Sequence, residues 1–352
     1  MTINNKFKNL IPQNIAPKNA KDIVVYNSKN VRIGHIPLNF LKQPVSDKQY
    51  SFCAVSDVHL QYDTANEDFQ RALTYVENND INFTCICGDL TVSGTDAQLT
   101  EYKNVVDTYA KTKPVYAISG NHDSIPDFMT TERISQYTGQ PLCYSFTQGN
   151  DVFIMVGHYG KYYGDNIGWN NAEFISKQEL QWLYETLETN RNRRCFIFNH
   201  VYPYQDGVGD ANRLYNGNYW STTDGGIGQA YIELIKHYKN TILFHGHSHL
   251  RFHLQEIDKK ANYSENVGYR SVHIPSLSVP RDLSDGATTY IYAESEGYIV
   301  DVYDDYIILN GRDFIDNDND GNIIPIATYK IDTTLVNVDA NTFVDSTGTI
   351  TT

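Results

Sequence analysis

The stretch 115–123 reads VYAISGNHD, and the change of character in the middle of it decides the fold. Its first half is an apolar run with β-branched and aromatic residues, which predicts a buried strand from Val115 to Ser119. A single glycine then leads into Asn121, His122 and Asp123, residue types that bind metals or take part in catalysis. The stretch therefore predicts a strand whose carboxyl end carries chemically active side chains.

Four further apolar runs end in the same way, each leading directly into aspartate, asparagine or histidine. In open α/β sheets, ligands bind outside the carboxyl ends of the strands, so five such ends can converge on one crevice. The four runs are Ser51–Ser56 before Asp57-Val58-His59, Phe83–Cys87 before Gly88-Asp89, Arg194–Phe198 before Asn199-His200, and Thr241–Phe244 before His245-Gly246-His247-Ser248-His249.

Two of these clusters place such residues two positions apart, Asp57 with His59 and His247 with His249. An extended backbone points residues at this spacing to the same side. Carboxylate, imidazole and amide oxygen together suit divalent manganese, iron, zinc or cobalt, whereas a set made only of oxygen atoms suits magnesium or calcium. The sequence therefore predicts a dinuclear metal centre that catalyses hydrolysis.

Helical patterns fill the intervals between these strands. Phe69, Leu73 and Val76 recur at spacings of four and three after the first cluster, which predicts an amphipathic helix. The alternation of strand and helix is typical of parallel βαβ units. Further along, residues 176–179 read SKQE, a capping box that predicts the start of another helix.

Other segments predict a second sheet. Cys143–Phe146 and Val152–Val156 flank a turn and predict a hairpin at its start, and residues 23–33 predict a separate hairpin before the first motif. Beyond Leu250, strand-forming runs predict the remainder of the second sheet: His253–Gln255, Ser271–Ile274, Thr288–Ala293, Tyr298–Val302, Tyr306–Leu309 and Pro325–Ile331.

The chain has 352 residues and a formal net charge of −14, from 28 Lys and Arg against 42 Asp and Glu. Binding of duplex DNA depends on neutralising phosphates, so this charge disfavours an extended nucleic-acid partner. Two divalent ions outweigh the charges of Asp57 and Asp89, so the site itself stays cationic. We therefore expect a small phosphoester or nucleotide as the substrate.

No run of about 18 apolar residues is present, so we expect no membrane span and no membrane partner. Residues 1–6 lack the apolar segment of a signal peptide. The five cysteines have neither the spacing of a metal motif nor the density of a disulfide framework, which favours a reducing compartment. We expect a cytoplasmic protein, with a virion-associated or extracellular location as the alternative, and leave the oligomeric state open.

The motifs follow one another as Asp-x-His, Gly-Asp, Gly-Asn-His-Asp, His and Gly-His-x-His, and this order resembles the calcineurin-like metallophosphoesterase superfamily over about Ser51 to Leu250. The resemblance implies an α/β fold in which two mixed β-sheets pack face to face, with helices on the outer faces. It also implies a metal-dependent hydrolase with two divalent or trivalent transition-metal ions, manganese, iron or zinc. A hydroxide bridging the metals is implied to attack the phosphoester.

Carried over by position, the resemblance implies seven metal ligands, arranged as two sets around one bridging aspartate. The first set is Asp57, His59 and His249, the second set is Asn121, His200 and His247, and the bridge is Asp89.

The resemblance places His122 beside the scissile phosphate rather than on a metal. We interpret His122 as the catalytic group that protonates the leaving oxygen or stabilises its charge. The alternative is a structural or metal-ligating histidine. A covalent mechanism needs a nucleophile paired with a base, and no cysteine lies beside a histidine in this sequence.

Residues 88–94 read GDLTVSG, which departs from two branches of the superfamily. Serine/threonine phosphatases carry Gly-Asp-x-x-Asp-Arg-Gly here, and purple acid phosphatases place a metal-binding tyrosine where Val92 stands. The form is more similar to class III cyclic-nucleotide phosphodiesterases, which favours a phosphodiesterase over a phosphomonoesterase. The alternatives are a nuclease on the same scaffold and a non-catalytic virion or surface module that retains the fold.

Aromatic residues in the loops 157–174 and 201–227 are predicted to wall the substrate crevice, because loops after strand ends carry function and aromatic faces stack on bases. The alternative is that they pack as ordinary loop anchors. The substrate contacts that we predict are Tyr163, Tyr202 and Trp220, with Arg213 and Arg281 as the basic residues near the site.

The domain organisation follows from composition and from the span of the motifs. We expect a flexible arm over 1–21, one catalytic domain over 22–331, and a polar tail over 332–352 that either extends or forms a short hairpin. Residues 316–321 read DNDNDG, like the start of an EF-hand loop, but Ala327 stands where the bidentate glutamate belongs. An acidic turn and a calcium site are both open there.

Overall fold

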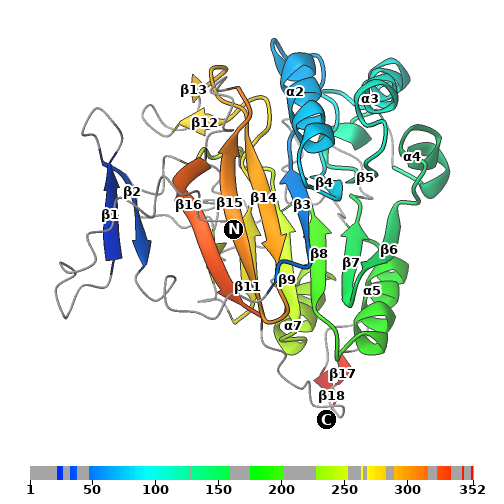
Figure 1. The fold of residues 1–352 in the computed structure, drawn as a ribbon. Helices are drawn as coiled ribbons and strands as arrows, with labels where there is room; N and C mark the ends of the chain where they lie inside the picture. Colours follow the sequence, from blue (N-terminus) through cyan, green and yellow to red (C-terminus); the bar gives the residue numbers. More distant parts are fainter. Residues whose placement is uncertain are drawn as a thin grey trace.

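The computed structural model of the chain describes residues 22–26, 32–37, 47–126, 129–158, 175–201, 227–252, 263–264, 268–282, 289–315, 323–333, 343–344 and 350–351. Two six-stranded sheets pack face to face, and helices cover their outer faces (Figure 1). This arrangement confirms the predicted architecture of two mixed sheets between outer helices.

The first sheet has the strand order β16-β15-β14-β3-β4-β5. Strands β3, β4 and β5 run parallel, whereas β14, β15 and β16 are antiparallel to their neighbours. The three parallel strands precede Asp57, Asp89 and Asn121. The bounds are β3 Tyr50–Val55, β4 Phe83–Cys87, β5 Val115–Ile118, β14 Glu296–Val302, β15 Tyr306–Asp313 and β16 Ile323–Asp332.

The second sheet has the order β10-β11-β9-β8-β7-β6. Strands β7, β8, β9 and β11 run parallel, and antiparallel strands form both edges. Strands β8 and β9 lead to His200 and His247, so the five motif strands are divided between the two sheets. The bounds are β6 Cys143–Gln148, β7 Asp151–Val156, β8 Cys195–Asn199, β9 Thr241–His245, β10 Tyr263–Ser264 and β11 Arg270–His273.

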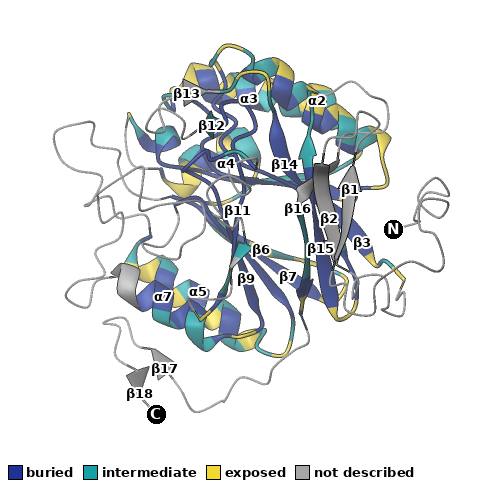
Figure 2. Cartoon of the chain, turned by 90° about the vertical axis from the view of Figure 1, so that its left-hand side faces the viewer, coloured by how far each residue is buried: buried dark blue, intermediate teal, exposed yellow. Residues whose placement is uncertain are grey.

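Amphipathic helices cover each sheet on the side away from the other. Figure 2 shows α2, α3 and α4 on one side of the sandwich and α5 and α7 on the other, with buried faces turned inward. Ser176 caps α5 through the predicted capping box with Glu179. The bounds are α2 Ala65–Asn78, α3 Asp96–Tyr109, α4 Thr131–Thr138, α5 Lys177–Thr189 and α7 Ile227–His237.

The core between the sheets is rich in phenylalanine. Phe52 of the first sheet meets Phe153 and Phe196 of the second, with ring centroids 5.1 and 5.5 Å apart. Phe198 and Phe244 stack at 4.9 Å farther along. These rings are fully buried, so they fix the spacing of the two sheets and with it the relative positions of their strand ends.

A buried ion pair of the second sheet is hydrogen-bonded to the first sheet at the end opposite those strand ends. Arg194 Nη2 lies 2.6 Å from Asp151 Oδ2, and Asp151 also accepts a hydrogen bond from the Tyr50 hydroxyl. Arg194 in turn donates to the Tyr303 carbonyl and to Thr333 Oγ1. Residues that precede strands of the second sheet are thus bonded to residues at the ends of strands in the first.

The prediction for the late strands was wrong. Segments beginning at Tyr298, Tyr306 and Pro325 were expected in the second sheet, but they form β14, β15 and β16 of the first. The reason is that β14 pairs with the edge of β3 that β4 leaves open, Tyr298 opposite Ala54. Alternation of apolar residues indicates a strand but does not indicate which edge it joins. Among the late segments that the structure describes, the one at Ser271 entered the second sheet, as β11.

Several short elements lie outside the sandwich sheets. Hairpin β1 (Asp22–Tyr26) with β2 (Arg32–Pro37) confirms the predicted N-terminal hairpin. The segment expected over 288–293 is reduced to β13 (Thr289–Tyr290), paired with β12 (Arg281–Asp282), and β17 (Phe343–Val344) pairs with β18 (Ile350–Thr351). Residues 1–21, 253–255 and 316–321 lie outside the described residues, so the predictions made for them stay predictions. Among the described helices, none is long and apolar enough to cross a membrane.

Candidate metal centre

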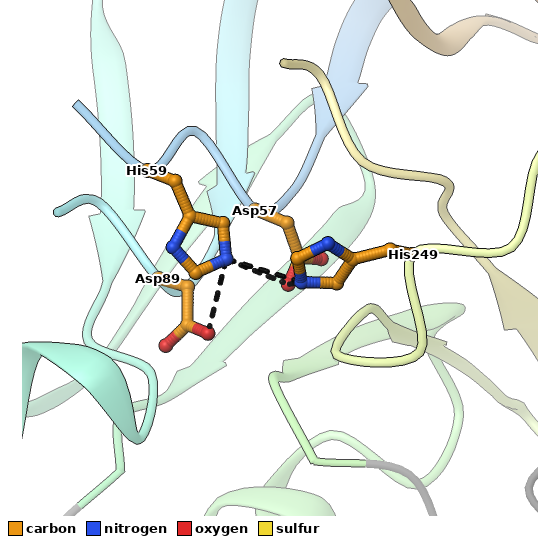
Figure 3. A group of neighbouring side chains, drawn as sticks. All are labelled: Asp57, His59, Asp89 and His249. Carbon is orange, nitrogen blue, oxygen red and sulfur yellow. Dashed lines mark hydrogen bonds and ion pairs between the residues drawn. The ribbon is translucent and has the colours of Figure 1, made fainter. Parts of the chain in front are cut away.

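The carboxyl ends of β3, β4, β8 and β9 bring two groups of donor side chains together, and the groups share Asp89. The ligand atoms within each group lie within 4.8 Å of one another, and all of the residues are buried. Six of the seven predicted ligands are thus in two adjoining groups. The first group is Asp57, His59, Asp89 and His249 (Figure 3), and the second is Asp89, His200 and His247.

In the first group the donor atoms point at one another. His59 Nε2 lies 3.1 Å from His249 Nε2, 3.7 Å from Asp57 Oδ1 and 3.5 Å from Asp89 Oδ2. His249 Nε2 lies 2.9 Å from Asp57 Oδ1. Ligands at about 2.1 Å from one ion stand roughly 3 to 3.5 Å apart, so these spacings suit a common ion.

The second group adjoins the first through both carboxylates. His200 Nε2 lies 3.1 Å from Asp89 Oδ2 and 3.8 Å from Asp57 Oδ1, and the rings of His200 and His247 are 5.3 Å apart. The seventh predicted ligand, Asn121, is buried in the loop after β5. Its amide group forms no hydrogen bond with the described residues.

Backbone carbonyls fix the imidazole rings. The Nδ1–H of His200 donates to the Cys87 carbonyl at 2.6 Å, and that of His249 donates to the Val279 carbonyl at 3.1 Å. With the proton held on Nδ1, the lone pair of each ring is on Nε2, the atom that faces the carboxylates. Such hydrogen bonds select the ligating tautomer of a histidine.

The two carboxylates and the histidines perturb one another strongly. Burial opposes ionisation of Asp57, but the charges of His249 and His200 hold its pKa well below its usual range. Burial also disfavours the charged form of His200, yet the Asp89 and Asp57 carboxylates raise the pKa of His200 to about 9. Burial lowers the pKa of His59 to about 4. Both carboxylates are therefore anionic, and His200 is the cation that balances them when no metal is bound.

The ligand residues have an unusual backbone. Five of them have φ in the left-handed region, so the explanation of the two-residue spacing by an extended backbone was wrong. The chain turns sharply at the strand ends, and aspartate and histidine tolerate this region better than most residues. Such conformations persist where the surrounding fold enforces them, commonly at functional sites. The φ values are 52° for Asp57, 46° for His59, 49° for Asp89, 73° for His247 and 62° for His249.

Two glycines leave room for the carboxylates. A Cβ atom on Gly120 would lie 2.1 Å from Asp89 Oδ1, and one on Gly246 would lie 2.5 Å from Asp57 Oδ2 and 1.9 Å from Ser56 Oγ. Real Cβ atoms do not approach other atoms this closely. The glycines of the motifs are therefore required because neighbouring loops pass against them.

The donor set passes a simple test of fit for a transition metal. Both polar atoms of the Asn121 amide, a predicted ligand, are buried and form no hydrogen bond with the described residues, although buried polar atoms in proteins nearly always do. Nitrogen and carboxylate oxygen donors around one point suit manganese, iron or zinc rather than calcium. The residues present therefore fit two such ions that share Asp89.

His122 lies at the rim of the donor groups. Its ring is perpendicular to that of His59, with centroids 4.7 Å apart. Its backbone N–H donates to Asp89 Oδ1 at 2.8 Å, and its Nδ1–H donates to the Val92 carbonyl at 2.7 Å. His122 is thus beside the ligands without belonging to either group.

Of the predicted substrate contacts, the structure describes Arg281. Its backbone N–H donates to the carbonyl of His249 at 2.8 Å. Burial lowers the pKa of His249, the Asp57 carboxylate opposes this shift, and the charge of Arg281 adds to it. The other four, Tyr163, Tyr202, Arg213 and Trp220, lie outside the described residues.

Sequence reasoning missed several residues that support the site. The buried carboxylate of Asp123 accepts hydrogen bonds from the backbone of Leu90, Thr91 and Gly120. Arg133 of α4 donates to the carbonyl of Asp123. Asp123 belongs to a recognised motif, which was a signal of importance, whereas nothing in the sequence around Arg133 connects it with the site.

Solved structures with the same fold share little sequence with this chain. A dimetal phosphatase from Danio rerio aligns with a TM-score of 0.56 at 13% identity, over 82% of this chain and 100% of that one. GAP50, the anchor in the inner membrane complex of Plasmodium, aligns with a TM-score of 0.50 at 13% identity, over 84% and 93%. At such identities the likeness establishes the fold alone.

No curated protein matches the chain at a significant level. The sequence profile described as calcineurin-like phosphoesterase does match it, over residues 50–251. The chain belongs to the calcineurin-like phosphoesterase family. In this family member the matched region begins at the first residue of β3 and ends two residues beyond His249, so it contains both donor groups.

Family membership confirms the resemblance drawn from the motifs. Calcineurin-like phosphoesterases are metal-dependent hydrolases with a dinuclear centre, and the two donor groups provide a candidate for that centre here. The class of chemistry is therefore hydrolysis of a phosphoester. The identity of the metals stays a prediction.

Proposed function

We propose that this chain is a dinuclear metallophosphoesterase whose metals are held by the residues of the two donor groups and by Asn121. The observation that carries the proposal is that both groups share the buried carboxylate of Asp89, the arrangement that a bridging ligand requires. One set is His59, His249 and Asp57, and the other is His200, His247 and Asn121.

Two ions held in this way supply positive charge for the phosphate oxygens and lower the pKa of a water molecule. The protein contributes the orientation. Asp57 also accepts a hydrogen bond from the His247 backbone at 3.0 Å, which ties the loop after β9 to the loop after β3. The Asp57 carboxylate thus fixes the loop after β9 relative to the loop after β3.

His122 is the proposed general acid. Because its Nδ1–H is bonded to the Val92 carbonyl, Nε2 is the nitrogen that can carry a proton to the leaving oxygen. A positioned acid contributes roughly 10²- to 10⁴-fold to such reactions. An alkoxide leaving group needs this proton more than a nitrophenolate does, so the contribution of His122 depends on the ester.

For the substrate we propose a small phosphodiester or nucleotide. The segment after Asp89 lacks the Asp-Arg-Gly extension of the monoester-cleaving phosphatases. Arg281, whose backbone N–H donates to the His249 carbonyl, is the basic residue that we propose near the substrate. A diester carries less charge than a monoester and needs fewer cationic contacts. The net charge of −14 argues against a nuclease that binds long nucleic acids.

A comparison of two aryl esters tests this proposal. Bis(p-nitrophenyl) phosphate and p-nitrophenyl phosphate are supplied to the metal-depleted protein with manganese, iron, zinc or magnesium added back singly. We expect the diester to be hydrolysed at least as fast as the monoester. If the monoester is hydrolysed more than about tenfold faster, a difference of about 1.4 kcal/mol in transition-state free energy, the diester assignment is refuted. The assignment as a phosphoesterase would still stand.

The non-catalytic alternative has one observation in its favour, because GAP50, which shares the fold, is described as an anchor. A structural module needs no complete set of ligands, however. All seven predicted ligands are present in this sequence, and the six in the two donor groups converge. Absence of hydrolysis with every metal and both esters would support the alternative.

A further inference from the structure

The group that orients His122 is a backbone carbonyl, and the segment that carries it is itself held by side chains. We call residues 90–94 the Val92 segment. The Asp123 carboxylate accepts hydrogen bonds from the Leu90 and Thr91 backbone and from Thr91 Oγ1, at 2.9 to 3.0 Å. Thr91 Oγ1 accepts in turn from the Gly94 N–H at 2.9 Å. The first half of the segment is thus fixed to the loop that carries His122.

The second half of the Val92 segment is fixed by Arg133, which projects from the first turn of α4. Its Nη2 donates to the Gly94 carbonyl, and its Nη1 donates to the Asp123 carbonyl at 3.4 Å. One guanidinium therefore bridges the segment that accepts from His122 and the loop that carries His122. Arg133 Nη2 also lies 3.6 Å from Asp96 Oδ1, but the Asp96 side chain is mostly exposed, so water screens this ion pair.

The Val92 segment and the loop that carries His122 are in direct contact where Arg133 bridges them. A Cβ atom on Gly94 would lie 2.1 Å from the Asp123 carbonyl oxygen. The Ser93 N–H is also bound, by Gln98 Oε1 of α3 at 2.8 Å. Residues on both sides of Val92 are therefore anchored, and the carbonyl of Val92 has little freedom to turn away from His122.

We propose that Arg133 is a positioning residue for the reaction, which keeps the Val92 carbonyl on the Nδ1–H of His122, so that Nε2 is the ring nitrogen that carries the proton for the leaving oxygen. The inference rests on the proposed function of His122 as general acid. It assigns a role to a residue that lies outside every sequence motif. The assignment rests only on the hydrogen bonds of Arg133 to the Gly94 and Asp123 carbonyls and of His122 to the Val92 carbonyl.

Arginine suits this position because its planar fork presents several N–H groups at fixed angles, so a single side chain can donate to two carbonyls at once. A lysine has one ammonium group on a flexible chain and cannot hold both carbonyls in the same geometry. We therefore expect Arg133→Lys to behave more like Arg133→Met than like the wild type.

The first test uses diesters with different leaving groups. For an alkyl leaving group, Arg133→Met is expected to lower kcat by about tenfold or more, part of the range for general acid catalysis, with KM and metal content unchanged. For bis(p-nitrophenyl) phosphate the loss is expected to be small. Arg191→Met is the matched control, since Arg191 pairs with Glu188 on α5 and is partly exposed. Equal losses on both ester classes would overturn the inference.

A double variant separates positioning from a general structural effect. In the His122→Asn background, Arg133→Met is expected to cost nothing further, because the group that it positions is gone. Additive losses would contradict the inference. If His122→Asn itself retains full activity on alkyl diesters, the proposed role of His122 fails; if it loses activity and Arg133→Met does not, the present inference alone fails.

A readout independent of activity is the tautomer of His122 in the metal-free protein, seen in long-range ¹H–¹⁵N spectra and assigned by comparison with His122→Asn. We expect a proton on Nδ1 in the wild type and a mixture of both tautomers in Arg133→Met. If Arg133→Met does not fold, Arg133→Lys is used in its place. An unchanged Nδ1–H tautomer in the folded variant would overturn the inference.

Discussion

The Nε2 atoms of His59 and His249 lie 3.1 Å apart, although the two residues follow strands of different sheets. The donor groups therefore lie where the carboxyl ends of strands from the two sheets come together. An ion held by these rings would connect the sheets at one end, as the hydrogen bonds from Tyr50 to Asp151 and from Arg194 to the Tyr303 carbonyl do at the other.

Metal removal is expected to destabilise the fold for this reason. A ligand that binds only the folded state stabilises it by about 4 kcal/mol when present at a thousand times its Kd. We expect chelation to lower the Tm, and manganese or zinc to restore it. The measurement is thermal unfolding with and without chelator. An unchanged Tm after verified metal loss would contradict the connection between the sheets.

Gly120→Ala and Gly246→Ala are expected to reduce metal binding, because each new Cβ would collide with a ligand carboxylate or its neighbour. Gly149→Ala is the matched control: its φ of 58° gives it the cost of a left-handed residue, but nothing lies within 4 Å of the added Cβ. We expect the control to lose roughly 1 kcal/mol of stability and no metal. Metal content of the three purified variants checks this, and normal content in Gly246→Ala would count against it.

Metal uptake is expected to release a proton from His200. Its pKa is raised to about 9 in the metal-free protein, so it is charged at pH 7, whereas His59, with a pKa of about 4, is already neutral. A ligand must be neutral to bind, so affinity should rise with pH up to about 9 and level off above it. Calorimetry in buffers of different ionisation enthalpy counts the protons. Uptake without proton release at pH 7 would contradict the prediction.

Breaking the buried pair by Arg194→Met is expected to cost about 3 to 5 kcal/mol of unfolding free energy, because it leaves Asp151 buried without its partner. The exposed pair of Lys103 and Asp107 is the control, and its loss should cost at most about 1 kcal/mol. Denaturant unfolding measures both. Similar small losses of unfolding free energy from the two changes would show that the buried pair contributes no more stability than the exposed pair.

The strands and the candidate ligands could be predicted because both leave local signals. Apolar runs of the right length marked β3, β4, β5, β8 and β9, and the polar residue after each run marked its end. The type of each side chain then limited the metals that it could bind.

What could not be predicted depends on contacts between distant segments. The pairing of β14 with β3 joins Tyr298 to Ala54 and has no local signal. The left-handed backbone at Asp57 is imposed by the packing of the loops, and the bridge from Arg133 to Gly94 depends on how α4 is placed. Pattern and spacing cannot supply such relationships.

The metal content of the purified protein tests the central claim most directly, and two variants sharpen it. We expect the wild type to bind two ions per chain under metal excess, His249→Ala to lose chiefly one, and Asp89→Ala to lose occupancy at both positions, since Asp89 belongs to both donor groups. Hydrolysis should return only as the second ion binds. A wild-type protein that stays at one ion per chain under metal excess, with full activity, would contradict the dinuclear account.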